Sequence, residues 1–351
     1  RHPGAEHVED EHGDEELVTG TVENSFVETE GGSAGMSWVG DRGYVGAAFG
    51  VYDSRYGVPG HAHDHDEDEH GEPFAATLEP GHDHEEPGDE GVSVDLEQRR
   101  LDLHARYDAP LSGVEAVQAR LGWRDYRHQE LEGDDLGTLF TNELLEARIE
   151  ALLSPLGRFE GTAGLNVLDR DFAAVGEEAY IQPTATQRLA VFLYEELPAE
   201  PWGVQLGARF ETQDTSSSDP GLPDRDFDGV SASAGVSYAF AETWLVSLAT
   251  SRSERAPTAE ELYSDGPHAA TFSYEIGDPE LGSEVGNGLD LTLRASVGRF
   301  DGSLAVFATR FDDYLYLDDT GEVRDGLEVR RFTQADTRFD GFELHGDLEL
   351  L

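Results

Sequence analysis

The chain has 351 residues and no cysteine, so it can form neither a disulfide framework nor a thiolate metal site. Its 74 acidic and 24 basic residues give a formal net charge of −50 at pH 7, which argues against nucleic acid as a partner because phosphate would be repelled. No stretch approaches the roughly 18–20 continuous apolar residues that a membrane helix needs. Membrane-spanning strands are not excluded, because their apolar and polar residues alternate and their mean hydropathy is therefore polar. The acidity fits either a cation-collecting surface or a generic acidic surface suited to a salty habitat.

Apolar and polar residues alternate with a period of two through much of the chain, which predicts β-strands with two different faces. The predicted strands, in chain order, are 33–40, 43–53, 92–107, 113–127, 138–151, 157–168, 185–196, 203–213, 226–239, 244–252, 288–297, 303–312, 327–334 and 338–350. The clearest alternating runs have about 9–13 residues, close to the length of a tilted strand that crosses a membrane.

Short and long links alternate between these strands. The short links are 41–42, 108–112, 152–156, 197–202, 240–243 and 298–302, and the long links are 54–91, 128–137, 169–184, 214–225, 253–287 and 313–326. An up-and-down meander places alternate links at opposite ends, so one end carries tight turns and the other carries long loops. We therefore predict an all-β fold, a transmembrane antiparallel up-and-down β-barrel with about 14 strands visible. Because an open sheet edge is not viable in lipid, we expect this sequence to be part of a larger barrel.

One long link is rich in metal-binding side chains. Imidazole nitrogen together with carboxylate oxygen suits Zn²⁺ and similar divalent ions. The candidate ligands of link 54–91 are His61, His63, Asp64, His65, Asp66, His70, His82 and His84. His128 and His268 stand at the starts of other long links and are candidates for a defined site. The alternative interpretation is a solvated loop without a binding role. Metal affinity should fall below about pH 6, as histidines protonate near their reference pKa of ~6.5.

Sequence patterns of catalysis are missing. The chain has no phosphate loop, no G-x-S-x-G elbow and no H-E-x-x-H pair. Acidic residues are so abundant that two of them close together in the sequence are no evidence for a catalytic acid–base pair. We predict no catalytic residue, no catalytic cofactor and no enzyme activity.

Several segments resemble the barrel of TonB-dependent outer-membrane receptors. Residues 253–263 (SERAPTAEELY) and 275–281 (EIGDPEL) are similar to the R-x-P-x-x-x-E-L and G-N/D-P-x-L patterns of that family. Residues 332–343 (FTQADTRFDGFE) resemble a further family pattern, with departures at 334–335 and 337. The segments NSF at 24–26, YGVPGH at 56–61, DLEQ at 95–98, DYRH at 125–128 and TLFTNE at 138–143 resemble the zinc-uptake branch, which carries a histidine- and acid-rich external loop after Y-G-x-P-G-H.

The resemblance implies an outer-membrane active-transport receptor in which residues 1–351 form a partial barrel and 54–91 an extracellular loop. It implies outer-membrane lipid, a metal ion and a TonB-type energy-transducing protein as partners, the last through a plug domain that we do not find in this sequence. The family's C-terminal strand with a terminal aromatic residue is not found either. The expected cargo is zinc or a similar divalent ion. The alternatives are a siderophore, haem or cobalamin receptor of the same fold, or a soluble secreted acidic metal-binding β-protein.

Overall fold

The computed structural model describes residues 5–8, 16–19, 22, 24–59, 92–133, 135–156, 158–176, 179–268, 271 and 273–350. In this part of the chain a 15-stranded sheet has the order β13-β14-β17-β16-β15-β12-β11-β10-β9-β8-β7-β6-β5-β4-β3, and β1 and β2 form a separate hairpin. The elements are β1 Ala5–Val8, β2 Glu16–Thr19, β3 Val27–Gly40, β4 Gly43–Gly57, β5 Val92–Leu111, β6 Val114–Glu132, β7 Asp135–Leu156, β8 Phe159–Gly176, β9 Thr184–Ala199, β10 Trp202–Ser217, β11 Arg225–Ala241, β12 Trp244–Arg255, α1 Ala259–Tyr263, β13 Asp265–His268, β14 Ser273–Ile276, β15 Glu284–Val297, β16 Phe300–Arg324 and β17 Leu327–Leu348. No helix among the described residues has both the length and the apolar character needed to cross a bilayer.

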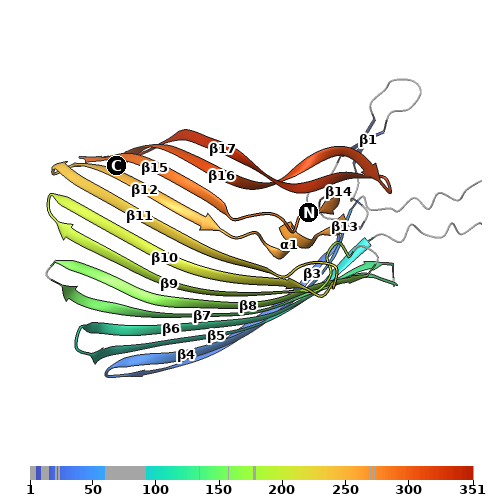
Figure 1. The fold of residues 1–351 in the computed structure, drawn as a ribbon, viewed down its shortest axis with the longest axis horizontal. Coiled ribbons are helices and arrows are strands. Elements are labelled where there is room, and N and C mark those ends of the chain that lie inside the picture. The colour runs from blue at the N-terminus through green and yellow to red at the C-terminus, as the bar shows by residue number, and fades with distance from the viewer. Residues whose placement is uncertain are drawn as a thin grey trace, which may run out of the picture.

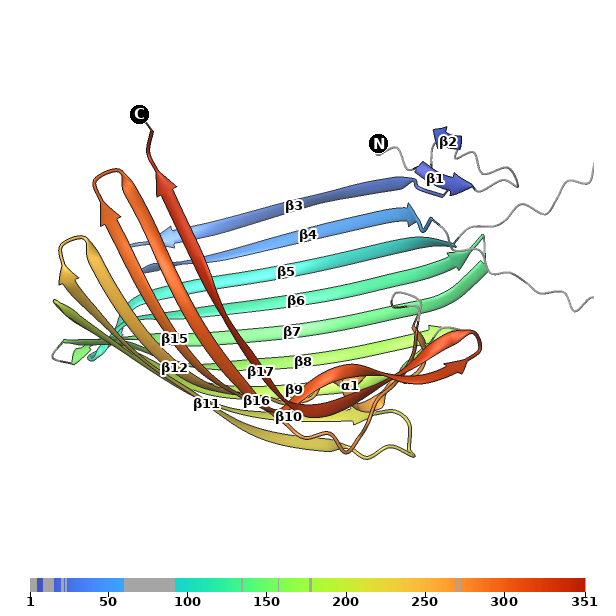
Figure 2. The ribbon, with the colours of Figure 1, turned by 90° about the horizontal axis from the view of Figure 1, so that it is seen from above.

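The long strands form an antiparallel meander that curves into an open trough (Figures 1 and 2). Each consecutive pair is antiparallel, and the one parallel contact in the described sheet joins β14 to residues 328–331 of β17. The predicted up-and-down barrel architecture is confirmed.

One pair of predicted strands and two predicted links were wrong. Predicted strands 327–334 and 338–350 form one strand, β17, so the described meander has thirteen long strands, β3–β12 and β15–β17. The predicted long links 128–137 and 313–326 are mostly strand as well, because β6, β7, β16 and β17 continue to tight turns. Gly133 (φ 60°) and Gly326 (φ 80°) adopt the left-handed backbone that these turns require. The structural reason is that these hairpins keep pairing well beyond the length that a membrane needs.

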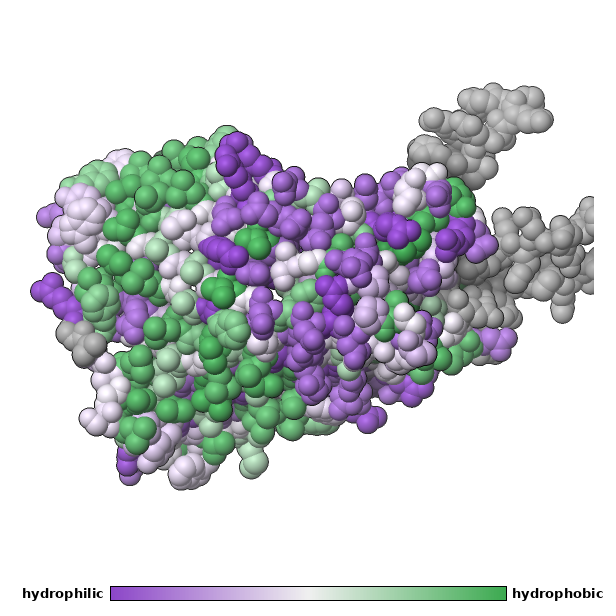
Figure 3. Space-filling model, in the orientation of Figure 1, coloured by the Kyte–Doolittle hydropathy of each residue, from purple (hydrophilic) through white to green (hydrophobic). Residues whose placement is uncertain are grey.

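One face of the meander is apolar at the turn end. Leu289 and Leu291 on β15 are 51% and 47% exposed, and Leu248 on the neighbouring strand is 44% exposed. Figure 3 shows hydrophobic side chains gathered over the turn half and hydrophilic ones over the loop half. Large apolar side chains are exposed side by side on this outer face, which is the surface of a lipid-facing band.

The opposite, inner face carries charged side chains that pair along their own strands. Arg148 contacts Glu150 at 2.7 Å, and Arg209 pairs with Glu211. Residues two apart on a strand share a face, so each such arginine is neutralised locally. The segment between β12 and β15 lies on this inner face, because Glu260 of α1 pairs with Arg170 of β8 at 2.8 Å.

The buried apolar cluster lies at the loop end rather than in the middle of the sheet. Its members join α1 to β8, β16 and the link before β9: Ala174, Tyr180, Ile181, Ala259, Leu262, Tyr263, Leu281 and Leu315. The described residues of segment 256–283, which contains α1, β13 and β14, therefore pack against the inner face of the sheet (Figure 1).

Candidate metal-binding site at the loop end of the sheet

Two of the histidines predicted as ligands belong to one aromatic column at the loop end. The His128 ring lies 5.2 Å from Phe140, Phe140 lies 6.4 Å from Tyr180, and Tyr180 stacks on His268 at 4.3 Å with an interplanar angle of 15°. His128 lies inside β6, not at the start of a loop as predicted, and His268 is the last residue of β13. The fold nevertheless brings the two histidines, 140 positions apart in the sequence, into one cluster.

His128 faces a carboxylate on its own strand. Its Nδ1 lies 3.1 Å from the Tyr126 hydroxyl, and its Nε2 lies 3.5 Å from Oε1 of Glu130. These three residues alternate along β6 and so share the inner face. His128 Nε2 and Glu130 Oε2 are both shielded from solvent and have no hydrogen-bond partner. Buried polar atoms are normally satisfied, so this nitrogen and oxygen form an unfilled pair of the kind that a divalent ion accepts.

His268 is held by a buried carboxylate. Glu275, 4% exposed, accepts hydrogen bonds at Oε1 from His268 Nδ1 at 3.0 Å and from the Thr271 hydroxyl at 2.7 Å. Burial by itself would raise the pKa of Glu275, but these hydrogen bonds and the nearby imidazole outweigh it and hold the pKa below its ordinary value. An ionised carboxylate only accepts, so Nδ1 of His268 carries the proton. In a neutral imidazole with this tautomer, Nε2 carries the lone pair, as in metal-ligating histidines whose other nitrogen donates to a carboxylate.

The R-x-P-x-x-x-E-L segment fixes the start of α1. Thr258 accepts a hydrogen bond from the Glu261 backbone, and Glu261 accepts one from the Thr258 backbone, which makes a capping box. Arg255 donates to both carboxylate oxygens of Glu261, at 2.8 and 3.1 Å. The arginine and glutamate of the motif therefore anchor the helix to the end of β12.

Packing then sets the position of β13 and β14. Leu262 is fully buried, and the Tyr263 hydroxyl is within hydrogen-bond distance of the Thr215 and Pro223 carbonyls, at 3.0 and 2.9 Å. Gly266 and Gly277 lie so close to the neighbouring backbone that a Cβ would approach Tyr180 Cα at 2.6 Å and Leu262 C at 2.7 Å. Glycine is required at both positions, and the hairpin that carries His268 and Glu275 is held directly beneath Tyr180.

The described residues contain no group of three or more histidine, aspartate or glutamate side chains arranged to hold a metal ion. His128 with Glu130 and His268 with Glu275 are thus two partial ligand sets. The predicted ligands His61, His63, Asp64, His65, Asp66, His70, His82 and His84 lie outside the described residues. Glu130 and Glu275 were missed at the sequence level. The spacing His128-x-Glu130 could have indicated the first if the predicted strand 113–127 had been extended, whereas the second depends on the pairing of Gly266 with Glu275 in the β13–β14 hairpin.

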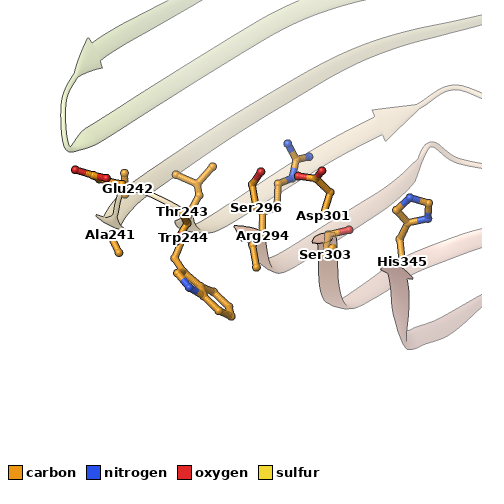
Figure 4. Close-up of a pocket in the computed structure, with 13 residues that line it drawn as sticks. Ala241, Glu242, Thr243, Trp244, Arg294, Ser296, Asp301, Ser303 and His345 are labelled. Carbon is orange, nitrogen blue, oxygen red and sulfur yellow. The ribbon is translucent and has the colours of Figure 1, made fainter. Parts of the chain in front are cut away.

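A hollow of about 440 Å³ lies at the turn end, beside turns 242–243 and 298–299 (Figure 4). Figure 4 shows Arg294 and Asp301 on one side of the ribbon and Trp244 pointing to the other side. His345, which also lines it, pairs with Asp347 at 2.6 Å. Neither His128 nor His268, the two predicted ligands that the structure describes, lines this hollow, so we place the candidate site at the loop end.

Comparison with known proteins agrees with the architecture. A family model described as TonB dependent receptor-like, beta-barrel matches residues 22–351. Similar solved structures include the copper transporter OprC (12% identity, TM-score 0.72, 93% of this chain and 52% of that one) and the siderophore receptor PirA from Pseudomonas aeruginosa (14%, 0.63, 92% and 53%). The iron transporter FrpB from Neisseria meningitidis is also similar (12%, 0.69, 99% and 54%). The chain thus spans about half the length of the structures it matches.

Proposed function

Because this chain belongs to the TonB-dependent receptor β-barrel family of the outer membrane, we propose that it forms part of an active-transport receptor for a scarce nutrient, with zinc or a similar divalent metal ion as the cargo. The whole receptor would draw energy from a TonB-type partner through a plug domain. The cargo is the substrate of this process, so no resident cofactor is needed.

The observation that carries the metal proposal is the pair of histidine–carboxylate sets on one aromatic column. His128 and Glu130 offer a nitrogen and an oxygen that nothing else satisfies. His268 offers Nε2, with its tautomer fixed by Glu275. Imidazole and carboxylate without thiolate suit a site that must bind Zn²⁺ and later release it.

The segment 60–91 supports the proposal through its composition alone. Its histidines and carboxylates provide many alternative ligand sets, which favours loose capture of ions at the receptor mouth over a single tight geometry. We propose that this segment raises the local ion concentration and that His128 and His268 belong to the site that receives the ion.

A second cargo is supported by the similar structures. OprC is named as a copper transporter and PirA as a siderophore receptor, so the same architecture accepts a metal ion in one protein and an organic chelate in another. A chelate receptor is therefore the main rival. The other alternative, a soluble secreted β-protein, does not fit a chain of this family with a wide exposed apolar band.

The test is isothermal calorimetry on the detergent-solubilised receptor, titrated in turn with Zn²⁺, Mn²⁺, Ni²⁺ and a ferric siderophore. A loop variant would carry alanine at His61, His63, His65, His70, His82 and His84. A rim variant would carry His128→Ala and His268→Ala. His104→Ala is the matched control, since that histidine lies on the inner face of β5 and contacts Tyr44 away from the column.

We expect Zn²⁺ binding that weakens in both the loop and the rim variants and is unchanged in the control. The loop variant should lose low-affinity sites, and the rim variant should lose the tighter one. If none of the divalent ions binds the unmodified receptor, the metal proposal is wrong and the search moves to organic chelates, while the family assignment stands.

A further inference from the structure

The imidazole of His128 lies between two side chains of its own strand. Tyr126, His128 and Glu130 alternate along β6, so they share the inner face, with about 6.7 Å from each residue to the next. The Tyr126 hydroxyl lies 3.1 Å from Nδ1 of the imidazole, and Oε1 of Glu130 lies 3.5 Å from Nε2. Each ring nitrogen therefore faces a different neighbour, and His128 can ligate an ion together with Glu130 only through Nε2.

Ring contacts keep the imidazole in this orientation. The Tyr126 ring meets it edge-on at a centroid distance of 6.2 Å, and the Phe140 ring is tilted against it at 5.2 Å. The side chains of His128 and Glu130 are still 19% and 18% exposed. An ion can therefore reach this pair from the trough, whereas the imidazole would have to break both ring contacts to turn Nδ1 toward the ion.

The two histidines of the candidate site have different partners at Nδ1. The partner of His268 is the Glu275 carboxylate, which only accepts a hydrogen bond. The partner of His128 is a phenol hydroxyl, which can donate or accept. The proton of a neutral His268 is therefore fixed on Nδ1, whereas a neutral His128 can carry its proton on either nitrogen.

We propose that Tyr126 is a positioning residue of the metal site, whose hydroxyl lets His128 change between a resting and a metal-binding tautomer. In the empty site the hydroxyl donates to Nδ1, and the Nε2 proton points toward the Glu130 carboxylate. When a divalent ion binds Nε2 and Glu130, the imidazole carries its proton on Nδ1 and the hydroxyl rotates to accept it. The imidazole releases one proton to water from Nε2 and takes one from water at Nδ1, so it stays neutral, and Tyr126 keeps its own proton. This proposal rests on the metal-transport function proposed above.

The resting arrangement is easily displaced by an ion. At 3.5 Å the contact between His128 and Glu130 is long, and neither Nε2 nor Oε2 of the carboxylate has a hydrogen-bond partner. A divalent ion supplies a better partner to both atoms. Because one hydroxyl serves both tautomers, the ion can bind and leave without a change in the charge of the imidazole, as a transport site requires.

The test removes only the hydroxyl. Tyr126→Phe keeps the ring that packs on His128, and loss of the partner of a ligating histidine lowers metal affinity by about 10–100-fold. We expect the tighter class of Zn²⁺ sites, measured by calorimetry on the detergent-solubilised receptor, to weaken by that factor. Tyr44→Phe is the matched control, because the Tyr44 hydroxyl lies 3.3 Å from both ring nitrogens of His104, another histidine of the inner face. This control should leave Zn²⁺ affinity unchanged.

Two further measurements separate positioning from a general loss of packing. In a His128→Ala background, Tyr126→Phe should change Zn²⁺ affinity by less than about twofold, since no imidazole is left to orient. Nitrogen NMR of the histidine-labelled, Zn²⁺-saturated receptor should show His128 protonated at Nδ1 and ligating through Nε2. Heat-modifiable mobility in gels shows that each variant is folded.

The outcomes distinguish this proposal from the proposed function. Zn²⁺ affinity that is equal in Tyr126→Phe and in the unmodified receptor would overturn the role of Tyr126 and leave the metal function standing. So would an equal loss in the His128→Ala background, or ligation of the ion through Nδ1. If the unmodified receptor binds no Zn²⁺, the proposed function is wrong and this proposal is wrong with it.

Discussion

Substitution of Leu262 by alanine should release the segment 256–283 from the inner wall while leaving the sheet intact. The Leu262 side chain is completely buried in the cluster that joins α1 to β8 and β16. A leucine-to-alanine change at such a site costs about 2–5 kcal/mol, because the transfer energy of the lost carbons adds to the cost of the cavity. At 1.4 kcal/mol for each factor of ten, local opening of the segment becomes at least about 30-fold more frequent.

Amide hydrogen exchange measures this opening directly. The reporters are the amides of Leu262, Ser264, Gly277 and Asp278, which donate to backbone carbonyls within the segment at distances of 2.7 to 3.2 Å. Their exchange should accelerate by that factor, while amides in the middle of β9 and β10 keep their rates. The metal site that we propose at His128 and His268 should be weakened too, because His268 and Glu275 belong to the same segment. The affinity for Zn²⁺ should therefore fall in parallel. Unchanged reporter exchange, or an equal acceleration throughout β9 and β10, would refute the view that this segment docks as a separate unit.

Three smaller perturbations follow from the same contacts and surfaces. Tyr263→Phe removes the hydroxyl that bonds to the wall carbonyls and should weaken docking by only about 1 kcal/mol, which exchange at the same reporters would resolve from the leucine variant. The pKa of Glu275 lies below its ordinary value of about 4.5. The contribution of this carboxylate to docking is therefore complete above pH 4.5 and is lost as the pH falls through the lower pKa of the folded state. Glu275→Gln should remove this acid dependence of hydrogen exchange in β14. Leu291→Arg on the outer face should lower the free energy of unfolding by about 2–4 kcal/mol, measured by urea titration of vesicle-folded protein. Thr292→Arg on the inner face should be tolerated. Similar losses for the two variants would mean that the faces are misassigned.

The strand pattern was predictable because period-two alternation reflects the two environments of a barrel wall. Residues 289–297 alternate along β15, and the structure places the leucines outward at that strand. The same signal stops where a strand leaves the membrane, since both faces are then wet. For this reason the extension of β16 beyond the band was assigned to the long link 313–326 and β17 was divided into two strands, although backbone pairing continues there to Arg324 and Leu327.

The candidate site was predictable only in part. Their position at predicted long links singled out His128 and His268, and the structure joins them through Phe140 and Tyr180. Glu130 lies two residues from His128 on the same strand and could have been found from that spacing, whereas Glu275 depends on how the described residues of segment 256–283 fold back, which local spacing does not reveal. The ligands of segment 60–91 remain a prediction.

The thirteen long strands of the described meander have a consequence for how this wall can be completed. Because each neighbour runs opposite to the last, an odd number makes β3 and β17 point in the same direction. These two edges cannot pair with one another in antiparallel fashion, and two copies with the same orientation in a membrane would meet through parallel seams on both sides. An antiparallel wall without free edges thus requires an odd number of further strands between β17 and β3, and any partner that supplies an even number leaves one mismatched seam exposed to lipid.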